Sequence, residues 1–268
     1  MSQTNDVTAQ NGKFVQVNDL KMYYEEYGSG EPLVLVHASL ATGAGNWKAY
    51  VPYLSEYFRL IMPDLRGHGR TNNPQGEIRL PTLTDDLVAF IKALKLEKTF
   101  LCGWSGGGDI ALDVGIRYPN SVRAMVVGGV THRVSEGYYK SMQAMGAEAP
   151  GKVNIEQFEK AMPQLAELLR VAHSQSPDHW KTLLSQISHE MLEPTLPSHD
   201  NLKKITAPTL IIWGDRDQFL PVEDAIELYR LIPNAELSVL PNTDHSLSRS
   251  RVEQFANLAK DFLMRHKE

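Results

Sequence analysis

The sequence predicts an α/β fold, a mostly parallel β-sheet flanked by helices, with a helical cap inserted after about the sixth strand. Three observations predict it. Short apolar runs alternate with amphipathic helical segments along most of the chain. The stretch 131–208 interrupts this alternation, and its periodicity is helical. A serine flanked by glycines stands where one strand-like run turns into a helix.

The first half of the chain supplies strands and helices in turn. Two β-prone runs, 14–17 and 20–27, are separated near Asn18 and Asp19, which is typical of an antiparallel hairpin. Residues 33–36 form a continuous apolar run, as expected of a strand buried on both faces of a parallel sheet. By the same criteria we expect strands at 58–62, 99–102 and 124–127 and helices at 46–57, 83–94 and 106–118.

The stretch 131–208 is too long for a structureless loop in a compact domain. We expect helices there, over about 136–145, 155–173 and 177–192. Alternation then resumes with strands at 209–213 and 236–240 and helices at 222–231 and 252–264. The sequence therefore predicts a core of 12–130 and 209–268, a cap of 131–208 and a polar N-terminal tail of 1–11.

Composition and charge exclude several classes of function. The chain has 268 residues and a net charge of −5, which disfavours a nucleic-acid binder. Cys102 is the single cysteine, so no internal disulfide and no cysteine-rich zinc site is expected, and no HExxH pattern is present. We expect no metal and, without a G-x-G-x-x-G or P-loop pattern, no cofactor.

No apolar run approaches the length of a transmembrane helix, which is about 18 residues. The N-terminal residues are polar and lack the basic start and apolar run of a signal peptide. We therefore expect no membrane partner and a cytoplasmic protein. Whether the chain is a monomer or a homodimer is left open.

The segment 103–107, Gly-Trp-Ser-Gly-Gly, fits the pattern G-x-S-x-G. A tight turn between strand and helix places the hydroxyl of Ser105 at the edge of the sheet. The helix that starts at Gly106 directs unpaired N–H groups and its positive dipole end toward the same place. We predict that Ser105 is a nucleophile rather than a plain turn serine.

A serine nucleophile needs a base, usually a histidine that is held by an acid. Of the nine histidines, His245 lies in the loop between the last predicted strand and the last helix, which a parallel sheet brings to the edge that carries Ser105. The acid is expected after strand 209–213. Asp215 and Asp217 both stand there, and the residues alone leave the choice between them open.

Acyl transfer also needs hydrogen-bond donors for the oxyanion that develops on the substrate. We expect one to be the backbone N–H of Gly106, directly after the nucleophile. The other is expected from the loop that follows strand 33–36. Its candidate is the N–H of Ser39, with that of Leu40 as the alternative.

These motifs together resemble the α/β-hydrolase superfamily, and within it the serine esterase-like branch, over nearly the whole chain. The resemblance is carried by the loop at His37, by Asp64-Leu65-Arg66-Gly67-His68-Gly69, by Gly103 to Gly107, and by Gly214 to Asp217 with His245. It implies a triad of Ser105, Asp217 and His245, and so selects Asp217 over Asp215. It also implies a helical cap and structural roles for His37 and His68.

The chain departs from the family pattern in the oxyanion loop. The family usually has glycine after the histidine, and this chain has Ala38, whose methyl group is expected to shift the loop or to narrow the site. Gly106 replaces a bulkier residue, which is expected to widen the site on the acyl side. Ser105 argues against the epoxide hydrolases and haloalkane dehalogenases of the superfamily, because their nucleophile is aspartate.

The predicted function is hydrolysis of carboxylic esters or lactones of small to medium apolar or aromatic substrates, through an acyl-enzyme on Ser105. The cap is rich in apolar side chains and carries no basic cluster for a phosphorylated substrate. We expect Leu40, Trp104, Tyr138 and Met142 to contact the substrate. Two alternatives remain. One is other triad chemistry, as in a cofactor-free perhydrolase or a carbon–carbon bond hydrolase. The other is a hydrolase-like ligand sensor with slow turnover.

Overall fold

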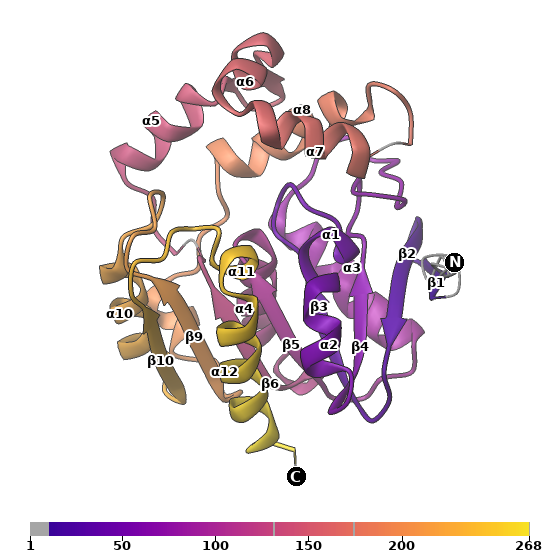
Figure 1. The fold of residues 1–268 in the computed structure, drawn as a ribbon, viewed down its shortest axis with the longest axis vertical. Helices are drawn as coiled ribbons and strands as arrows, with labels where there is room; N and C mark the ends of the chain where they lie inside the picture. The colour runs from indigo at the N-terminus through magenta and orange to yellow at the C-terminus, as the bar shows by residue number, and fades with distance from the viewer. Residues whose placement is uncertain (1–10, 131, 174, 268) are drawn as a thin grey trace, which may run out of the picture.

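The structure, a computed structural model, describes residues 11–130, 132–173 and 175–267. The described residues form one eight-stranded sheet in the order β1-β2-β4-β3-β5-β6-β9-β10 (Figure 1). Apart from Asn11, the expected tail 1–11 lies outside the described residues. The strands of this sheet are β1 (Gly12–Val17), β2 (Leu20–Tyr27), β3 (Glu31–Val36), β4 (Phe58–Pro63), β5 (Thr99–Trp104), β6 (Val122–Gly128), β9 (Thr209–Gly214) and β10 (Ala235–Leu240).

The sheet is mostly parallel, as the sequence predicts. Strand β1 pairs with β2 and β2 with β4 in antiparallel fashion, and all other neighbours are parallel. The hairpin predicted near Asn18 and Asp19 is confirmed, because Val17 lies opposite Leu20 and Asn18 has a positive φ of 50°. The carboxyl ends of the parallel strands therefore meet at one edge, where loops from several strands converge.

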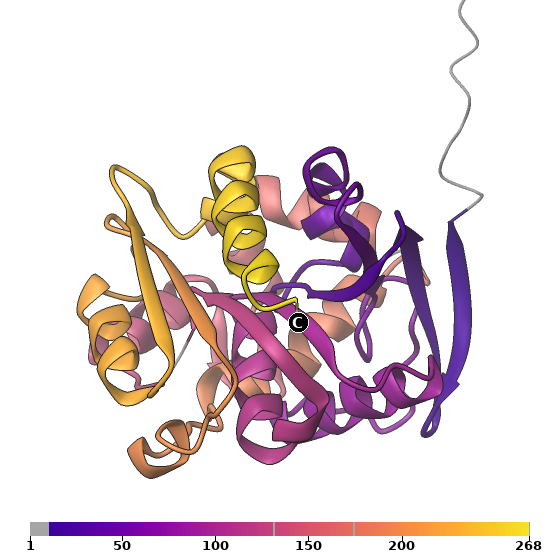
Figure 2. The same ribbon diagram turned by 90° about the horizontal axis from the view of Figure 1, so that it is seen from below.

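Helices cover both faces of the sheet (Figure 2). Helices α3, α4 and α10 pack on the face to which Val34 and Val36 point. Helices α1, α2 and α12 cover the opposite face, to which Leu33 and Leu35 point. The core helices are α1 (Gly43–Trp47), α2 (Val51–Leu54), α3 (Leu80–Ala93), α4 (Gly106–Arg117), α9 (His199–Leu202), α10 (Val222–Leu231), α11 (Leu247–Ser250) and α12 (Val252–Met264), with 3₁₀ turns at Lys48–Tyr50 and Pro119–Ser121.

Two predicted helices are divided in the structure. In place of one helix over 46–57, the structure has α1, a 3₁₀ turn and α2 over 43–54, and the hydroxyl of Thr42 caps the helix that begins at Gly43. The segment 155–173 breaks at Met162, one residue before Pro163. Proline is disfavoured inside a helix but suits its first turn, so a second helix begins there.

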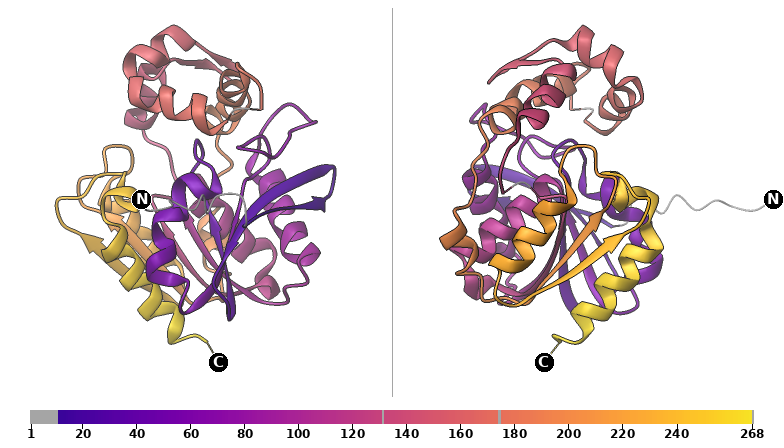
Figure 3. Two further views of the ribbon diagram at one scale, coloured as in Figure 1. Left: turned by 45° about the vertical axis from the view of Figure 1, so that its right-hand side comes forward. Right: turned by 90° about the vertical axis from the view of Figure 1, so that its left-hand side faces the viewer.

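The cap lies above the carboxyl edge of the sheet (Figure 3). In the chain it is inserted between β6 and β9. Its helices are α5 (Glu136–Ala144), α6 (Ile155–Ala161), α7 (Pro163–Ala172) and α8 (His179–Leu192). The end of the predicted range 131–208 differs, because Leu202 of α9 and Ile205 pack in the main core. Their apolar stripes meet in a small core of their own, around Phe158, Leu169 and Trp180. A short hairpin of β7 (Ala147–Ala149) and β8 (Lys152–Val153) joins α5 to α6, and strands this short leave no recognisable pattern in the sequence.

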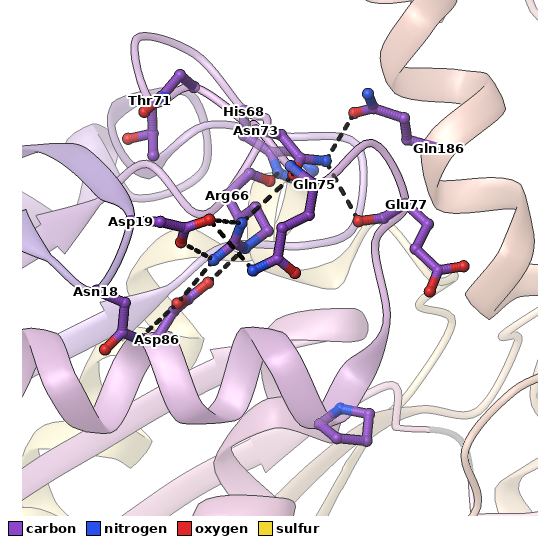
Figure 4. A network of polar contacts seen from close by, with 12 residues as sticks. Asn18, Asp19, Arg66, His68, Thr71, Asn73, Gln75, Glu77, Asp86 and Gln186 are labelled. Carbon is purple, nitrogen blue, oxygen red and sulfur yellow. Dashed lines mark hydrogen bonds and ion pairs between the residues drawn. The ribbon is translucent and has the colours of Figure 1, made fainter.

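The loop between β4 and α3 anchors the cap on one side. Buried Arg66 holds this loop through ion pairs with Asp86 and Asp19, and Asn73 of the same loop donates to the side chain of Gln186 in α8 (Figure 4). Charge-assisted bonds of this kind are strong when both partners are paired. The loop is therefore a fixed platform for α8.

Two further cap side chains bind the same loop through its backbone. The amide of Gln175 donates to the carbonyl groups of Gly69 and Thr71, and His179 contacts the carbonyl of Gly67 at 2.8 Å. The segment after α7 and the first residue of α8 are thus attached to the core. None of the helices in the described ranges combines the length and the apolar character that a membrane crossing requires.

Candidate active site

The site begins at the turn from β5 to α4. Ser105 occupies this turn with φ 54° and ψ −129°, a conformation that side-chain-bearing residues rarely adopt. A Cβ atom on Gly103 would lie 2.1 Å from the carbonyl oxygen of Gly107, and one on Gly107 would lie 2.2 Å from that of Val36. The two glycines of the motif are therefore required by the close approach of backbone to backbone, and the strained turn that they permit exposes Ser105.

Three predicted residues meet at this turn in one hydrogen-bonded chain. The Nε2 atom of His245 lies 3.2 Å from the Oγ atom of Ser105, and its Nδ1 atom lies 2.6 Å from Oδ2 of Asp217. The other carboxylate oxygen of Asp217 accepts the backbone N–H groups of Phe219 and Leu220. Since the carboxylate is fully buried, its position is fixed and it orients the imidazole toward Ser105.

Neighbouring side chains hold His245 in addition to Asp217. The indole of Trp104 donates to the carbonyl oxygen of His245, and the backbone N–H of His245 donates to the side chain of Gln218. The ring of Phe219 stands edge-on to the imidazole, with 5.2 Å between the ring centroids. Gln218 and Phe219 are not among the residues predicted from the sequence, although their place directly after Asp217 is a usable signal.

Two other carboxylates near the site lie outside the chain of hydrogen bonds to Ser105. Asp215 accepts the backbone N–H of Thr243 and so ties the loop after β9 to the loop that carries His245. Asp244 accepts the backbone N–H of Ser246, as a residue that forms a turn does. The structure therefore brings Asp217, and not Asp215, to the imidazole.

The oxyanion loop, which we define as residues 37–40, lies against the start of α4. A Cβ atom on Gly106 would lie 2.2 Å from Oγ and 3.4 Å from the backbone nitrogen of Ser39. The hydroxyl of Ser39 therefore occupies part of the space that a side chain at position 106 would take. The start of α4 and the oxyanion loop are thus in contact beside Ser105. The two expected oxyanion donors, the N–H groups of Gly106 and Ser39, belong to these two segments.

A cleft of about 500 Å³ opens over Ser105 and His245 between the core and the cap. Leu40, Trp104, Tyr138 and Met142, the four residues expected to contact substrate, all line it. Most of its remaining wall is apolar and comes from the cap and from the loops after β3 and β9. The charged side chain that lines it is Arg249, which is exposed at its mouth.

A second, smaller cavity of about 60 Å³ lies behind Ser39 and Gly106. Tyr138 and Met191 line both cavities and stand between them. The hydroxyl of Tyr138 donates to the carbonyl oxygen of Met191, and burial raises the pKa of Tyr138. The carboxylates of Asp109 and Glu190 lie in the wall of the small cavity.

A serine in a strained turn, hydrogen-bonded through histidine to a buried carboxylate on a mostly parallel sheet, defines the α/β-hydrolase class. The family model described as alpha/beta hydrolase family matches residues 33–258. The chain belongs to the alpha/beta hydrolase family.

Named relatives extend this comparison. The chain is 28% identical to 2-hydroxy-6-oxo-2,4-heptadienoate hydrolase of Pseudomonas putida, over 96% of this chain and 98% of that one. Among solved structures, the meta-cleavage product hydrolase CumD from Pseudomonas fluorescens superposes with a TM-score of 0.80 at 26% identity, covering 95% of this chain and 98% of that chain. A membrane phospholipase A superposes with a TM-score of 0.81 at 25% identity, covering 96% and 86%.

Proposed function

We propose that this chain is a serine hydrolase that cleaves carboxylic esters or lactones of small to medium apolar or aromatic substrates. The observation that carries the proposal is the hydrogen-bonded chain from Ser105 through His245 to Asp217 at the floor of an apolar cleft. In this reaction Ser105 is the nucleophile, His245 the base and acid, and Asp217 the residue that orients the imidazole and stabilises its cation.

The geometry supports a two-stage reaction. His245 takes the proton of Ser105 while Oγ bonds to the substrate carbonyl carbon, and the N–H groups of Gly106 and Ser39 stabilise the oxyanion. His245 then gives that proton to the leaving oxygen, the C–O bond breaks, and an acyl-enzyme remains. Water, deprotonated by His245, attacks the acyl carbon. Ser105 recovers its proton and the acid is released.

The lining of the cleft supports a neutral substrate. Apolar side chains dominate its wall, and the smaller cavity adds two carboxylates, Asp109 and Glu190. Among the described residues that line the smaller cavity there is no lysine or arginine. The carboxylate of Glu190 is paired with Arg79 at 3.3 Å. The apolar wall of the cleft is therefore the feature that favours a neutral substrate.

Carbon–carbon bond hydrolysis is the second candidate, and the names of the relatives favour it. The Pseudomonas putida relative is named for a 2-hydroxy-6-oxo dienoate, and the structural relative CumD is a meta-cleavage product hydrolase. Such a substrate carries a carboxylate, and Arg249 at the cleft mouth is the cation available to meet it. The same triad would serve, with a carbon atom instead of oxygen receiving the proton from His245.

The two candidates are separated by turnover of two substrate sets by the native chain and by Ser105→Ala. One set is p-nitrophenyl esters from acetate to decanoate, with a neutral lactone. The other is 2-hydroxy-6-oxo-2,4-heptadienoate. We expect ester turnover that falls about 10⁴–10⁶-fold in Ser105→Ala.

Faster turnover of the dienoate than of every ester, lost in Arg249→Ala, would transfer the assignment to carbon–carbon hydrolysis. A single burst of product without turnover of either set would indicate a ligand sensor. Unchanged ester turnover in Ser105→Ala would remove the proposal altogether.

A further inference from the structure

The oxyanion loop carries an unusual set of contacts on its carbonyl side. The carbonyl oxygens of three consecutive residues, Ala38, Ser39 and Leu40, each face a ring nitrogen of a different histidine. The three histidines come from three separate segments. His37 belongs to the loop itself, His68 to the loop after β4, and His173 to the cap at the end of α7.

The hydrogen bonds of His37 and His173 define their neutral forms. The Nε2 atom of His37 accepts the N–H of Leu65, so its Nδ1–H donates to Ala38 at 2.8 Å. The Nδ1 atom of His173 accepts the N–H of Gly69 at 2.9 Å, so its Nε2–H points to the carbonyl oxygen of Leu40 at 3.4 Å. Each ring is thereby a donor to the oxyanion loop and an acceptor from the loop after β4.

His68 stands between the other two rings. Its Nε2 atom lies 2.7 Å from the carbonyl oxygen of Ser39, and its Nδ1 atom lies 2.8 Å from that of Arg66. The neutral ring carries one N–H and donates to the carbonyl of Ser39 in the tautomer protonated at Nε2. The centroid of its ring lies 4.8 Å from that of His37 and 5.6 Å from that of His173. All three side chains are buried, so the row is packed on every side and a shift of one ring is passed to the next.

The position of this loop decides whether Ser39 can serve the reaction. An oxyanion donor must lie about 2.7–3.1 Å from the oxygen that it stabilises. Ala38 replaces the usual glycine, and Ser39 already touches Gly106 on the other side. The loop is therefore held between α4 and the histidine row, with little freedom to adjust by itself.

We propose that His68 and His173 are positioning residues for the oxyanion loop, and that His173 makes the geometry of the Ser39 donor depend on correct seating of the cap. This inference rests on the proposed serine chemistry at Ser105. The histidines touch neither substrate nor reacting atoms. They act by holding the carbonyl groups of Ser39 and Leu40 while the opposite side of the loop faces the oxyanion.

The competing explanation is that these histidines merely fasten the cap. His179 provides the matched control, because it is also a cap histidine on a core carbonyl group, that of Gly67, outside the oxyanion loop. A loss of cap attachment alone would give similar effects in variants of His173 and His179. A positioning role would appear at His173 and not at His179.

The test uses two conservative variants of His173 that separate its two hydrogen bonds. In His173→Asn the amide oxygen can replace Nδ1 as the acceptor for Gly69, and the donor to Leu40 is lost. In His173→Gln the amide nitrogen can replace Nε2 as the donor to Leu40. The readout is the rate at which a fluorophosphonate labels Ser105, measured by intact mass, since its transition state also uses the oxyanion donors.

We expect labelling to slow about 5- to 20-fold in His173→Asn, to recover to within about twofold in His173→Gln, and to stay near native in His179→Asn and His179→Gln. Equal slowing at positions 173 and 179, or no slowing in His173→Asn, would overturn the inference. Failure of the native chain to be labelled would instead refute the proposed function, so the two failures are distinguishable.

A second measurement needs no substitution. Long-range ¹H–¹⁵N spectra of the histidine rings are recorded before and after phosphonylation of Ser105. We expect the ring nitrogens of His68 and His173 to shift, because the phosphonyl oxygen takes hydrogen bonds from the oxyanion loop and so polarises the carbonyl groups that these rings contact, while those of His179 shift less. Unshifted signals of His68 and His173 in fully labelled protein would contradict a positioning role even if the His173 variants do not fold.

Discussion

The two sides of Ser105 are built in different ways. On the side of proton transfer, His245 and Asp217 are fixed by contacts within the core, from the loops after β9 and β10 and from Trp104. On the oxyanion side, the position of Ser39 depends on the row of His37, His68 and His173, of which the last belongs to the cap. Residues of the core alone hold the proton-transfer side. The oxyanion side also needs a residue of the cap.

Because of this difference, a change in the cap should affect catalysis through the oxyanion side and not through proton transfer. Movement of the cap leaves the bond between His245 and Asp217 intact, because no cap residue takes part in it. The same movement removes a donor from the carbonyl group of Leu40. We therefore expect defects on the proton-transfer side to be large and independent of the cap, and defects on the oxyanion side to be smaller and coupled to it.

Among substitutions of the residues around Ser105, the largest effect is expected from Asp217→Asn. The amide cannot stabilise the imidazolium and favours the wrong tautomer of His245, so kcat should fall about 10³- to 10⁴-fold while KM changes little. Ester turnover and thermal unfolding of the variant are the measurements. Asp215→Asn is the matched control and should retain kcat within about tenfold. A similar loss in both variants would remove the special role of Asp217.

A smaller effect is expected from Gly106→Ala on the oxyanion side. Its Cβ would meet Oγ of Ser39 at 2.2 Å and displace the oxyanion loop, so kcat should fall about 10- to 100-fold. Removing that oxygen with Ser39→Ala in the same chain should restore part of the loss, which a cycle of the single and double variants measures. Strictly additive losses would show that displacement of the loop is not the cause.

The histidine row also predicts how stability depends on pH. Burial lowers the pKa of His173 from 6.5 to about 3, and it lowers the pKa values of His37 and His68 as well. Below pH 6.5 the unfolded chain therefore binds protons that the folded chain does not. Stability is complete above pH 6.5 and is lost as the pH falls toward 3, with a slope of up to about 1.4 kcal/mol per pH unit for each histidine.

One buried carboxyl group acts in the opposite direction. Burial raises the pKa of Asp64 from 3.8 to about 6, so its folded form retains a proton that the unfolded chain has released between these values. Three histidines outweigh one carboxyl group, and urea unfolding at pH 4.5, 5.5 and 7 should show rising stability. His173→Gln should reduce that slope. A slope that stays the same would mean that His173 is protonated in the folded chain.

The smallest effect is expected from Gln186→Ala, which removes a hydrogen bond between α8 and Asn73 of the core. The free energy of unfolding should fall by about 0.5–1.5 kcal/mol, measured with urea, and ester turnover should stay within about twofold. The bond lies on the anchored side of the cap, away from the row of histidines. A tenfold loss of turnover in folded protein would show that coupling of the cap to the site extends beyond His173.

The fold and the residues around Ser105 were largely predictable from the sequence. Parallel strands have their carboxyl ends at one edge of the sheet, which brings Ser105 and His245 together. The strands themselves can be recognised from their apolar runs. Asp217 was not predictable from the residues alone, because Asp215 stands two positions away. The resemblance to a family selected it.

The histidine row was not predictable, for a physical reason. His173 stands in a helical insertion far along the chain from His37 and His68, and no periodicity reports contacts of that range. A buried histidine bonded to a backbone carbonyl leaves no pattern in the sequence. The breaks at Met162 and after Trp47 were missed because proline and capping chemistry outweighed a continuous apolar stripe.

The place of the cap, a single insertion between β6 and β9, bears on how such a protein evolves. An insertion of this kind suggests a module that can be exchanged to change the substrate range while the catalytic residues stay untouched. The contact of His173 with Leu40 limits that freedom. A cap inherited from another lineage would also have to bring a donor for this carbonyl group, so the unit that evolves together is the cap with residues 37–40.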